Sequence, residues 1–152
     1  MTATLLYRIA AVLLILFAVA HTFGTLLAPP PTPEAAALRH AMNQAFEVKG
    51  KSYSYGSFYT GLAVSITIYL LFLAFLAWHL GSVAARTPDA IGALGWVLCA
   101  AKVATLVVAW VYIAAAPAIS SALVALLLGL AAWKTRPAKA GAVSLTAAAS
   151  LG

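Results

Sequence analysis

The sequence SYSYGSFYTGLAVSITIYLLFLAFLAWHL occupies residues 52–80 and carries the clearest structural signal in the chain. It opens with tyrosines among small polar residues and continues as about 20 apolar positions, the length at which an α-helix crosses a bilayer. Tyrosine is enriched at the membrane–water interface, so the polar aromatic start marks where the helix enters the membrane. The stretch predicts a membrane-spanning helix over about residues 55–80.

The composition places the rest of the chain in the same class. Of its 152 residues, 64% are hydrophobic and 8% are charged, whereas soluble domains carry about 25% charged residues. The apolar residues form long blocks rather than the alternating pattern of a half-buried sheet. We therefore expect one all-α domain over residues 1–133, an integral membrane four-helix bundle.

The other three spans are predicted at about residues 5–27, 90–114 and 117–133. The first block could alternatively be a cleaved signal peptide, with Arg8 as its basic start and Ala18-Val19-Ala20 as its cleavage site. Because the block continues past that point, we favour a retained span. The link between the last two blocks is short, which predicts antiparallel neighbours.

A short amphipathic helix is predicted between the first two spans, at residues 33–48. The prolines at 29–31 end the first span, because proline has no amide hydrogen to donate. Thr32 and Pro33 are residue types favoured at a helix start. The polar side of this helix would carry His40, Asn43, Gln44 and Glu47. We expect it to lie on the membrane surface or over the mouth of the bundle.

The basic residues predict an orientation rather than a nucleic-acid partner. The formal net charge is +6, but lysine and arginine are scattered, without the basic stripe of nucleic-acid binding. Five of them fall on the side of the termini and three on the other side, and the cytoplasmic side is the more basic one. We expect both termini in the cytoplasm of a bacterium, with the protein in its inner membrane. Residues 134–152, which are basic and then alanine-rich, are expected to form a mobile tail.

Lys102 is the most unusual polar residue of the predicted spans. It lies near the middle of the third block, where insertion scales assign lysine a cost of about 3 kcal/mol. No Asp or Glu occurs in any predicted span, so these spans offer no close counter-ion. The side chain could extend to an interface without a role, or it could face a cavity or a ligand. Its helical face, shared with Gly95 and Cys99, favours the interior.

A second set of candidates is predicted at the outer end of the bundle. His21 and Tyr59 fall at similar depths in the first two spans, which run in opposite directions, and Glu47 lies just outside. With Lys102 they would orient the polar end of a ligand, and His with Glu can also move protons near neutral pH. The structural alternatives are a histidine bonded to a neighbouring helix, an exposed carboxylate and an interfacial tyrosine belt.

Metal and cofactor chemistry is not expected. Cys99 is the single cysteine, which excludes an internal disulfide and a cysteine-based zinc site. His21 and His79 fall toward opposite sides of the membrane, which argues against a shared haem. The sequence contains no HExxH, no GxSxG and no phosphate-binding glycine loop.

Several short motifs resemble those of a family of small bacterial four-span membrane proteins. They are His21-Thr22-Phe23-Gly24, Met42-Asn43, Ser54-Tyr55-Gly56 and Phe58-Tyr59 followed by Gly61. The resemblance covers about residues 5–133. It implies four helices and no particular substrate, and it points to the positions His21, Asn43, Tyr55, Tyr59 and Gly61. In size and span number the chain is also similar to DoxX-like proteins and to sterol-isomerase-like modules, although the latter use intramembrane carboxylates that this sequence lacks.

Three functional hypotheses follow. The leading one is a protein, not an enzyme, that binds membrane lipid or another apolar small molecule in an outward-facing pocket. The ligand-binding residues would be His21, Asn43, Glu47, Tyr55, Tyr59 and Lys102. The second is an accessory subunit of a membrane complex, or a homo-oligomer, whose small-residue helix faces pack on partner helices. The third is a membrane enzyme that transfers protons between His21 and Glu47.

Overall fold

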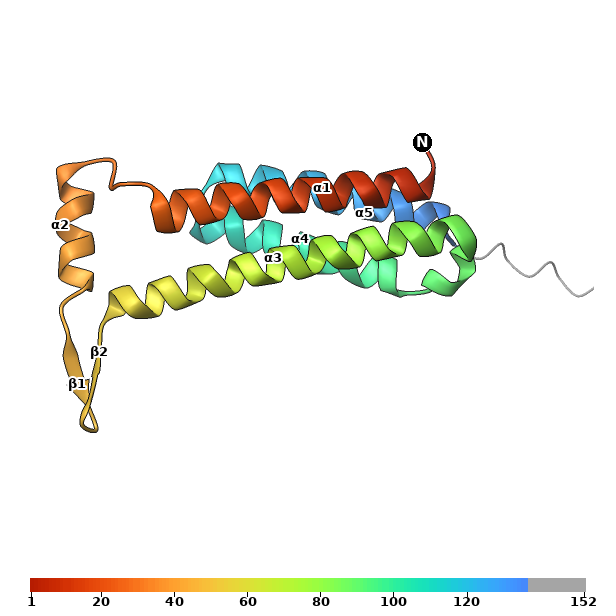
Figure 1. The fold of residues 1–152 in the computed structure, drawn as a ribbon. Helices are drawn as coiled ribbons and strands as arrows, with labels where there is room; N and C mark the ends of the chain where they lie inside the picture. Colours follow the sequence, from red (N-terminus) through yellow and green to blue (C-terminus); the bar gives the residue numbers. More distant parts are fainter. Residues whose placement is uncertain (137–152) are drawn as a thin grey trace, which may run out of the picture. The chain divides into compact units, whose positions relative to one another are not determined.

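The computed structural model describes residues 1–136, which are mostly helical (Figure 1). In this part of the chain, five α-helices and a β-hairpin follow one another. They are α1 (Ala3–Thr22), α2 (Pro33–Met42), β1 (Phe46–Val48), β2 (Lys51–Tyr53), α3 (Tyr55–Arg86), α4 (Leu94–Tyr112) and α5 (Ala115–Lys134). A π-helical turn, Phe23–Leu27, follows α1, and a 3₁₀ turn, Pro88–Ile91, precedes α4. The predicted helical fold class is confirmed, with the hairpin as an addition.

Four helical segments are long and apolar enough to cross a membrane. They are Ala3–Leu27, Tyr55–Arg86, Leu94–Tyr112 and Ala115–Lys134. Many of their large apolar side chains, such as Leu16, Phe72 and Val107, are exposed. In water such surfaces would be unfavourable, but in a bilayer the lipid chains are as apolar as the side chains.

The predicted amphipathic helix over residues 33–48 is wrong in its last six residues. The helix α2 ends at Met42, and β1 and β2 form an antiparallel hairpin in which Val48 pairs with Lys51. The two residues between them, Lys49 and Gly50, have φ values of 52° and 75°. This is the left-handed backbone of a two-residue hairpin turn, whose twist matches that of the strands.

The second predicted span continues beyond residue 80, and α3 ends at Arg86. Gly81, which follows the predicted end of the span, lies inside the helix, where another segment approaches closely. A Cβ atom at Gly81 would lie 3.2 Å from the Thr4 carbonyl oxygen and 3.3 Å from Arg8 Cγ. The glycine therefore permits close packing and does not end the helix.

The last two helices also begin at different residues than predicted. The 3₁₀ turn and Gly92, with φ of 53°, precede α4, so that helix begins only at Leu94. The helix α5 begins at Ala115, two residues before Pro117. Proline fits there because amides in the first turn have no partner within the helix.

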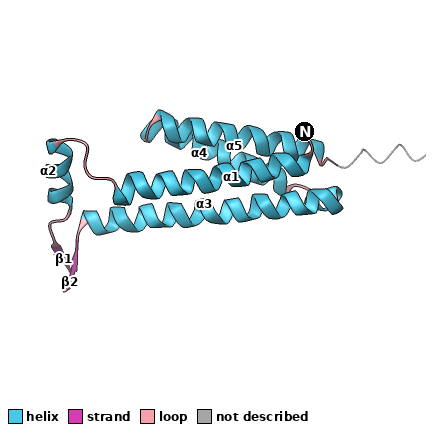
Figure 2. Ribbon diagram, turned by 45° about the horizontal axis from the view of Figure 1, so that its top comes forward, coloured by secondary structure: helices cyan, strands magenta, loops and turns pink. Residues whose placement is uncertain are grey.

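The chain divides into two compact units. Among the described residues, the first comprises Met1–Ala11 and the chain from Leu76 to residue 136, and the second is Val12–Phe75. In the first unit α4 and α5 pack along each other as an antiparallel pair (Figure 2). A Cβ atom at Gly129 would lie 3.2 Å from Cys99 Sγ, so glycine permits this close approach.

In the second unit, α2 and the hairpin connect the end of α1 to the start of α3 (Figure 1). The α1 and α3 segments of this unit are joined by the hydroxyls of Thr22 and Thr67, which lie 2.9 Å apart. Of the predicted mobile tail, residues 134–152, only the first three are described, and Lys134 is the last residue of α5. The prediction for residues 137–152 lies outside the described residues.

Candidate functional site

His21 lies where α1 changes into its π-helical turn. Its Nε2 atom is 3.2 Å from the carbonyl oxygen of Ala63 on α3. The carbonyl of His21 in turn accepts a hydrogen bond of 2.6 Å from the Thr25 hydroxyl. The His21 ring is therefore held by the neighbouring helix, which is the structural role considered for it. Local π-helical turns are nevertheless frequent at functional sites.

Asn43 caps the C-terminal end of α2 and lies directly against Gly56 in the first turn of α3. A Cβ atom at position 56 would collide with Asn43 Oδ1 and would lie 3.3 Å from the Met42 carbonyl oxygen. With the Asn43 side chain in this position, only glycine allows this approach. The motifs Met42-Asn43 and Ser54-Tyr55-Gly56 thus meet in space.

Ser54, the first residue of the Ser54-Tyr55-Gly56 motif, caps the start of α3. Its hydroxyl accepts a hydrogen bond of 3.0 Å from the Ser57 amide, and the Ser57 hydroxyl accepts one of 3.4 Å from the Ser54 amide. This reciprocal arrangement satisfies two amides at the start of α3. The segment before α3 is thereby anchored to the first turn of the helix.

The first groove, here called the α2 groove, lies between the π-helical turn, α2 and the start of α3, and has a volume of about 520 Å³. Its polar residues are Thr25, Arg39, Asn43, Tyr59 and Thr60, and its apolar ones include Leu26, Leu38 and Met42. Two predicted site residues, Asn43 and Tyr59, therefore share one groove. Arg39 is held there by its two terminal nitrogens, each 3.4 Å from the Ala28 carbonyl oxygen.

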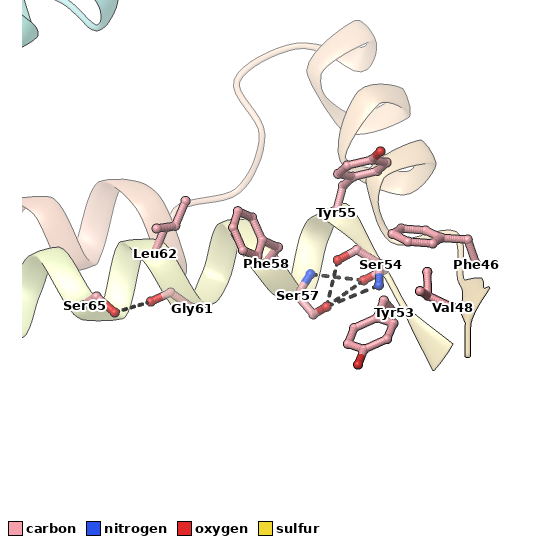
Figure 3. Close-up of a pocket in the computed structure, with 10 residues that line it drawn as sticks. All are labelled: Phe46, Val48, Tyr53, Ser54, Tyr55, Ser57, Phe58, Gly61, Leu62 and Ser65. Carbon is pink, nitrogen blue, oxygen red and sulfur yellow. Dashed lines mark hydrogen bonds between the residues drawn. The ribbon is translucent and has the colours of Figure 1, made fainter. Parts of the chain in front are cut away.

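The second groove, here called the hairpin groove, lies between the hairpin and the outer face of the α3 start, and has a volume of about 760 Å³ (Figure 3). Its walls are mainly aromatic and aliphatic. The Tyr55 ring lies 5.1 Å from that of Phe46, and Tyr53 points the opposite way (Figure 3). Phe58 and Leu62 continue the apolar wall along α3. Tyr55 is therefore placed in this groove and not in the α2 groove.

Glu47 lies on β1, opposite Ser52, and is exposed. Within the described residues it forms no ion pair or hydrogen bond with His21. Each of the two residues belongs to a different local structure, the hairpin and the α1 end. Proton transfer between His21 and Glu47 therefore stays a hypothesis.

Lys102 belongs to the first unit, where it is 2% exposed. Its inward position agrees with its predicted helical face. The Cys99 thiol donates to the Ala125 carbonyl oxygen at 3.3 Å, so antiparallel α4 and α5 place Lys102 and Ser121 at about the same depth. Within residues 1–136 neither side chain has a hydrogen-bond or ion-pair partner.

The charge of Glu34 is stabilised at the start of α2. Hydrogen bonds from its own backbone amide, and then from the Thr32 side chain, hold the pKa of this carboxyl below its usual value. The Thr32 hydroxyl also accepts from the Ala35 amide at 3.2 Å, which confirms the predicted helix cap. No three His, Cys, Asp or Glu side chains of residues 1–136 form a group that could hold a metal ion.

Sequence reasoning missed Arg39 and Thr60 as groove residues, and Phe46 and Phe58 as walls. Arg39 is one of the three basic residues predicted on the side opposite the termini. One signal could have found it, since Arg39 and Asn43 are four residues apart and so share a helical face.

Comparison of the chain with protein-family models, with curated proteins and with solved structures found no match. The resemblance to small four-span membrane proteins therefore stays a prediction.

Proposed function

We propose that this protein spans a membrane four times and binds a lipid-like or other apolar small molecule in its second unit. The observation that carries the proposal is the α2 groove, in which Arg39, Asn43 and Tyr59 stand beside an apolar floor. Small-molecule sites combine mainly apolar walls with a few polar groups, at volumes of about 300–1,000 Å³.

The polar end of the ligand would contact Arg39, Asn43 and Tyr59. The Ala28 carbonyl engages only part of the Arg39 fork, and a guanidinium carries about five N–H donors. The remaining donors suit a carboxylate or another anionic group. His21 would support the site indirectly, because its Nε2 contact with Ala63 joins the two helix segments.

The hairpin groove supports the apolar part of this proposal. Its large side chains are widely exposed, with Tyr55 and Phe58 each 68% accessible. Exposed apolar patches of this kind mark contact with a ligand, a partner or a membrane. In the predicted orientation these side chains lie at the non-cytoplasmic surface of the inner membrane, where lipid acyl chains are available.

Photochemical labelling tests the proposal. The full chain would be placed in phosphatidylcholine nanodiscs and illuminated with palmitate that carries a diazirine near the end of its chain. We expect the labelled adducts to be concentrated in residues 55–65. Tyr59→Phe should lower the labelling yield about fivefold, the effect of one lost hydrogen bond of about 1 kcal/mol.

Tyr69→Phe is the matched control. Tyr69 lies on the same helix and is 67% exposed, but it lines neither groove. Labelling of this variant should equal that of the original protein. Adducts spread evenly over the exposed apolar residues, or equal effects of the two substitutions, would show that no specific site exists.

One observation favours the second hypothesis, an accessory subunit or homo-oligomer. Ser57, Gly61 and Ser65 form a small-residue face on α3 that stays exposed, and nothing lies within 4 Å of a Cβ atom at Gly61. Such faces allow two helices to approach closely in a bilayer. A stable larger complex in native mass spectra, weakened by Gly61→Leu, would favour this function over ligand binding.

A further inference from the structure

A third groove lies in the first unit, between α4 and α5, and is here called the α4–α5 groove. Its volume is about 460 Å³. Val103, Leu106 and Leu126 supply aliphatic surface, while Ala122 and Gly129 leave space between them. The groove is thus almost wholly apolar and follows both helices of the first unit.

One end of this groove is basic and aromatic. Trp96, near the start of α4, and Trp133, near the end of α5, line it there. The Arg136 guanidinium lies over both rings, 4.8 Å from the centroid of Trp96 and 4.0 Å from that of Trp133. Lys134, the last residue of α5, is exposed at the same end.

These two cation–π contacts need none of the N–H groups of Arg136. The face of a guanidinium interacts with aromatic rings, while its N–H groups point outward in the plane. In the part of the chain that the structure describes, these N–H groups donate to no side chain or carbonyl, and Asp89, the acid of this unit, forms no ion pair with them. A preoriented cation therefore stands at the mouth of an apolar groove.

We propose that the α4–α5 groove binds an acyl chain of an anionic phospholipid, whose phosphate pairs with Arg136 and Lys134. Tryptophan and arginine at one helix end mark the level of the headgroups. Anionic lipids of the cytoplasmic leaflet are attracted to such clusters, and this is the side predicted for the C-terminal end of α5. An apolar partner helix would fill the groove but would leave the Arg136 charge without a complement.

Competition between two lipids tests this site. The delipidated full chain in a mild detergent would receive equal amounts of phosphatidylglycerol and phosphatidylcholine with identical chains, and native mass spectrometry would count the retained lipids. We expect phosphatidylglycerol to be retained preferentially. Arg136→Gln should reduce that preference about fivefold, the effect of about 1 kcal/mol per basic residue near the surface.

Arg86→Gln is the matched control, since it removes the same charge from an exposed arginine at the end of α3, outside the groove. Its lipid preference should match that of the original chain. Ala122→Phe would fill the groove and should reduce retention of both lipids. Equal retention of both lipids by the original chain, or equal effects of Arg136→Gln and Arg86→Gln, would overturn the proposal. So would a lipid-independent dimer that retains no lipid, because a second copy would then cover the groove.

Discussion

The contact between Asn43 and Gly56 ties the end of α2 to the first turn of α3. A methyl group at position 56 would collide with the Asn43 side chain, and the Met42 carbonyl leaves little room for relaxation. We expect Gly56→Ala to destabilise the protein by about 1–3 kcal/mol, the usual cost of overpacking. Thermal unfolding in detergent would measure this effect.

Gly61→Ala is the control for that substitution, because a Cβ atom there has nothing within 4 Å. On the same helix it should be neutral or stabilising by up to about 1 kcal/mol, since alanine is the better helix former. Adding Asn43→Ala should restore most of the stability that Gly56→Ala removes. If it restores none, the two residues do not interact as described.

Lys102 is a buried lysine whose side chain has no hydrogen-bond or ion-pair partner among the described residues. Replacing it by methionine keeps the length of the side chain and removes the desolvation cost, about 3 kcal/mol on insertion scales. We expect Lys102→Met to raise the unfolding temperature, and Lys51→Met, at an exposed position on β2, to leave it unchanged. A lower unfolding temperature for Lys102→Met would mean that the ammonium group has a favourable partner, such as a bound ligand.

The two-residue turn of the hairpin has lysine at its first position, where asparagine is the preferred residue. Lys49 adopts φ of 52°, and a left-handed backbone costs an ordinary residue about 1–2 kcal/mol. Asparagine tolerates this conformation and is preferred before glycine in such turns. We expect Lys49→Asn to slow amide hydrogen exchange in residues 46–53 several-fold.

Lys51→Asn provides the comparison for the hairpin, because it introduces the same residue into β2, one position beyond the turn. Asparagine is disfavoured in strands, so exchange should be unchanged or faster. Slower exchange in both variants would indicate an effect of the lost positive charge rather than of turn geometry.

The start of α2 should respond to acid. The pKa of Glu34 is lowered in the folded chain, so its stabilising contribution is present above the pKa of the unfolded chain and is lost as the pH falls through the folded-state value. Thr32→Val removes the cap, at a cost of about 1 kcal/mol, and should raise the Glu34 titration midpoint. Carbon NMR of the carboxyl group would follow this midpoint, and Thr105→Val on α4 should leave it unchanged.

For the whole molecule, four candidate spans predict that the hairpin and the link between α3 and α4 lie on opposite sides of the membrane. In a Cys99→Ser background, a membrane-impermeant maleimide should label Lys51→Cys in intact cells. Thr87→Cys should react only after lysis, because the more basic side is cytoplasmic. Labelling of Thr87→Cys alone would reverse the orientation, and labelling of both would contradict the number of spans.

The chain forms two units. The second unit contains the hairpin groove, and the first contains the α4–α5 groove. Asn43, Tyr55 and Tyr59 belong to the second unit, and Lys102 belongs to the first. The predicted site residues therefore do not all share one unit. The ligand proposal rests on the second unit alone, and the lipid proposal rests on the first.

The apolar helices, the cap at Thr32 and the inward helical face of Lys102 could be read from local sequence, because each depends on composition or spacing within a few turns of helix. The turn at Lys49-Gly50 also had a local signal, but a helical pattern over residues 33–48 competed with it. The grooves, the collision that reserves position 56 for glycine, and the placing of Arg136 over Trp96 depend on three-dimensional packing. Such contacts join residues far apart in the chain, and their side-chain geometry is set by packing that no local pattern contains.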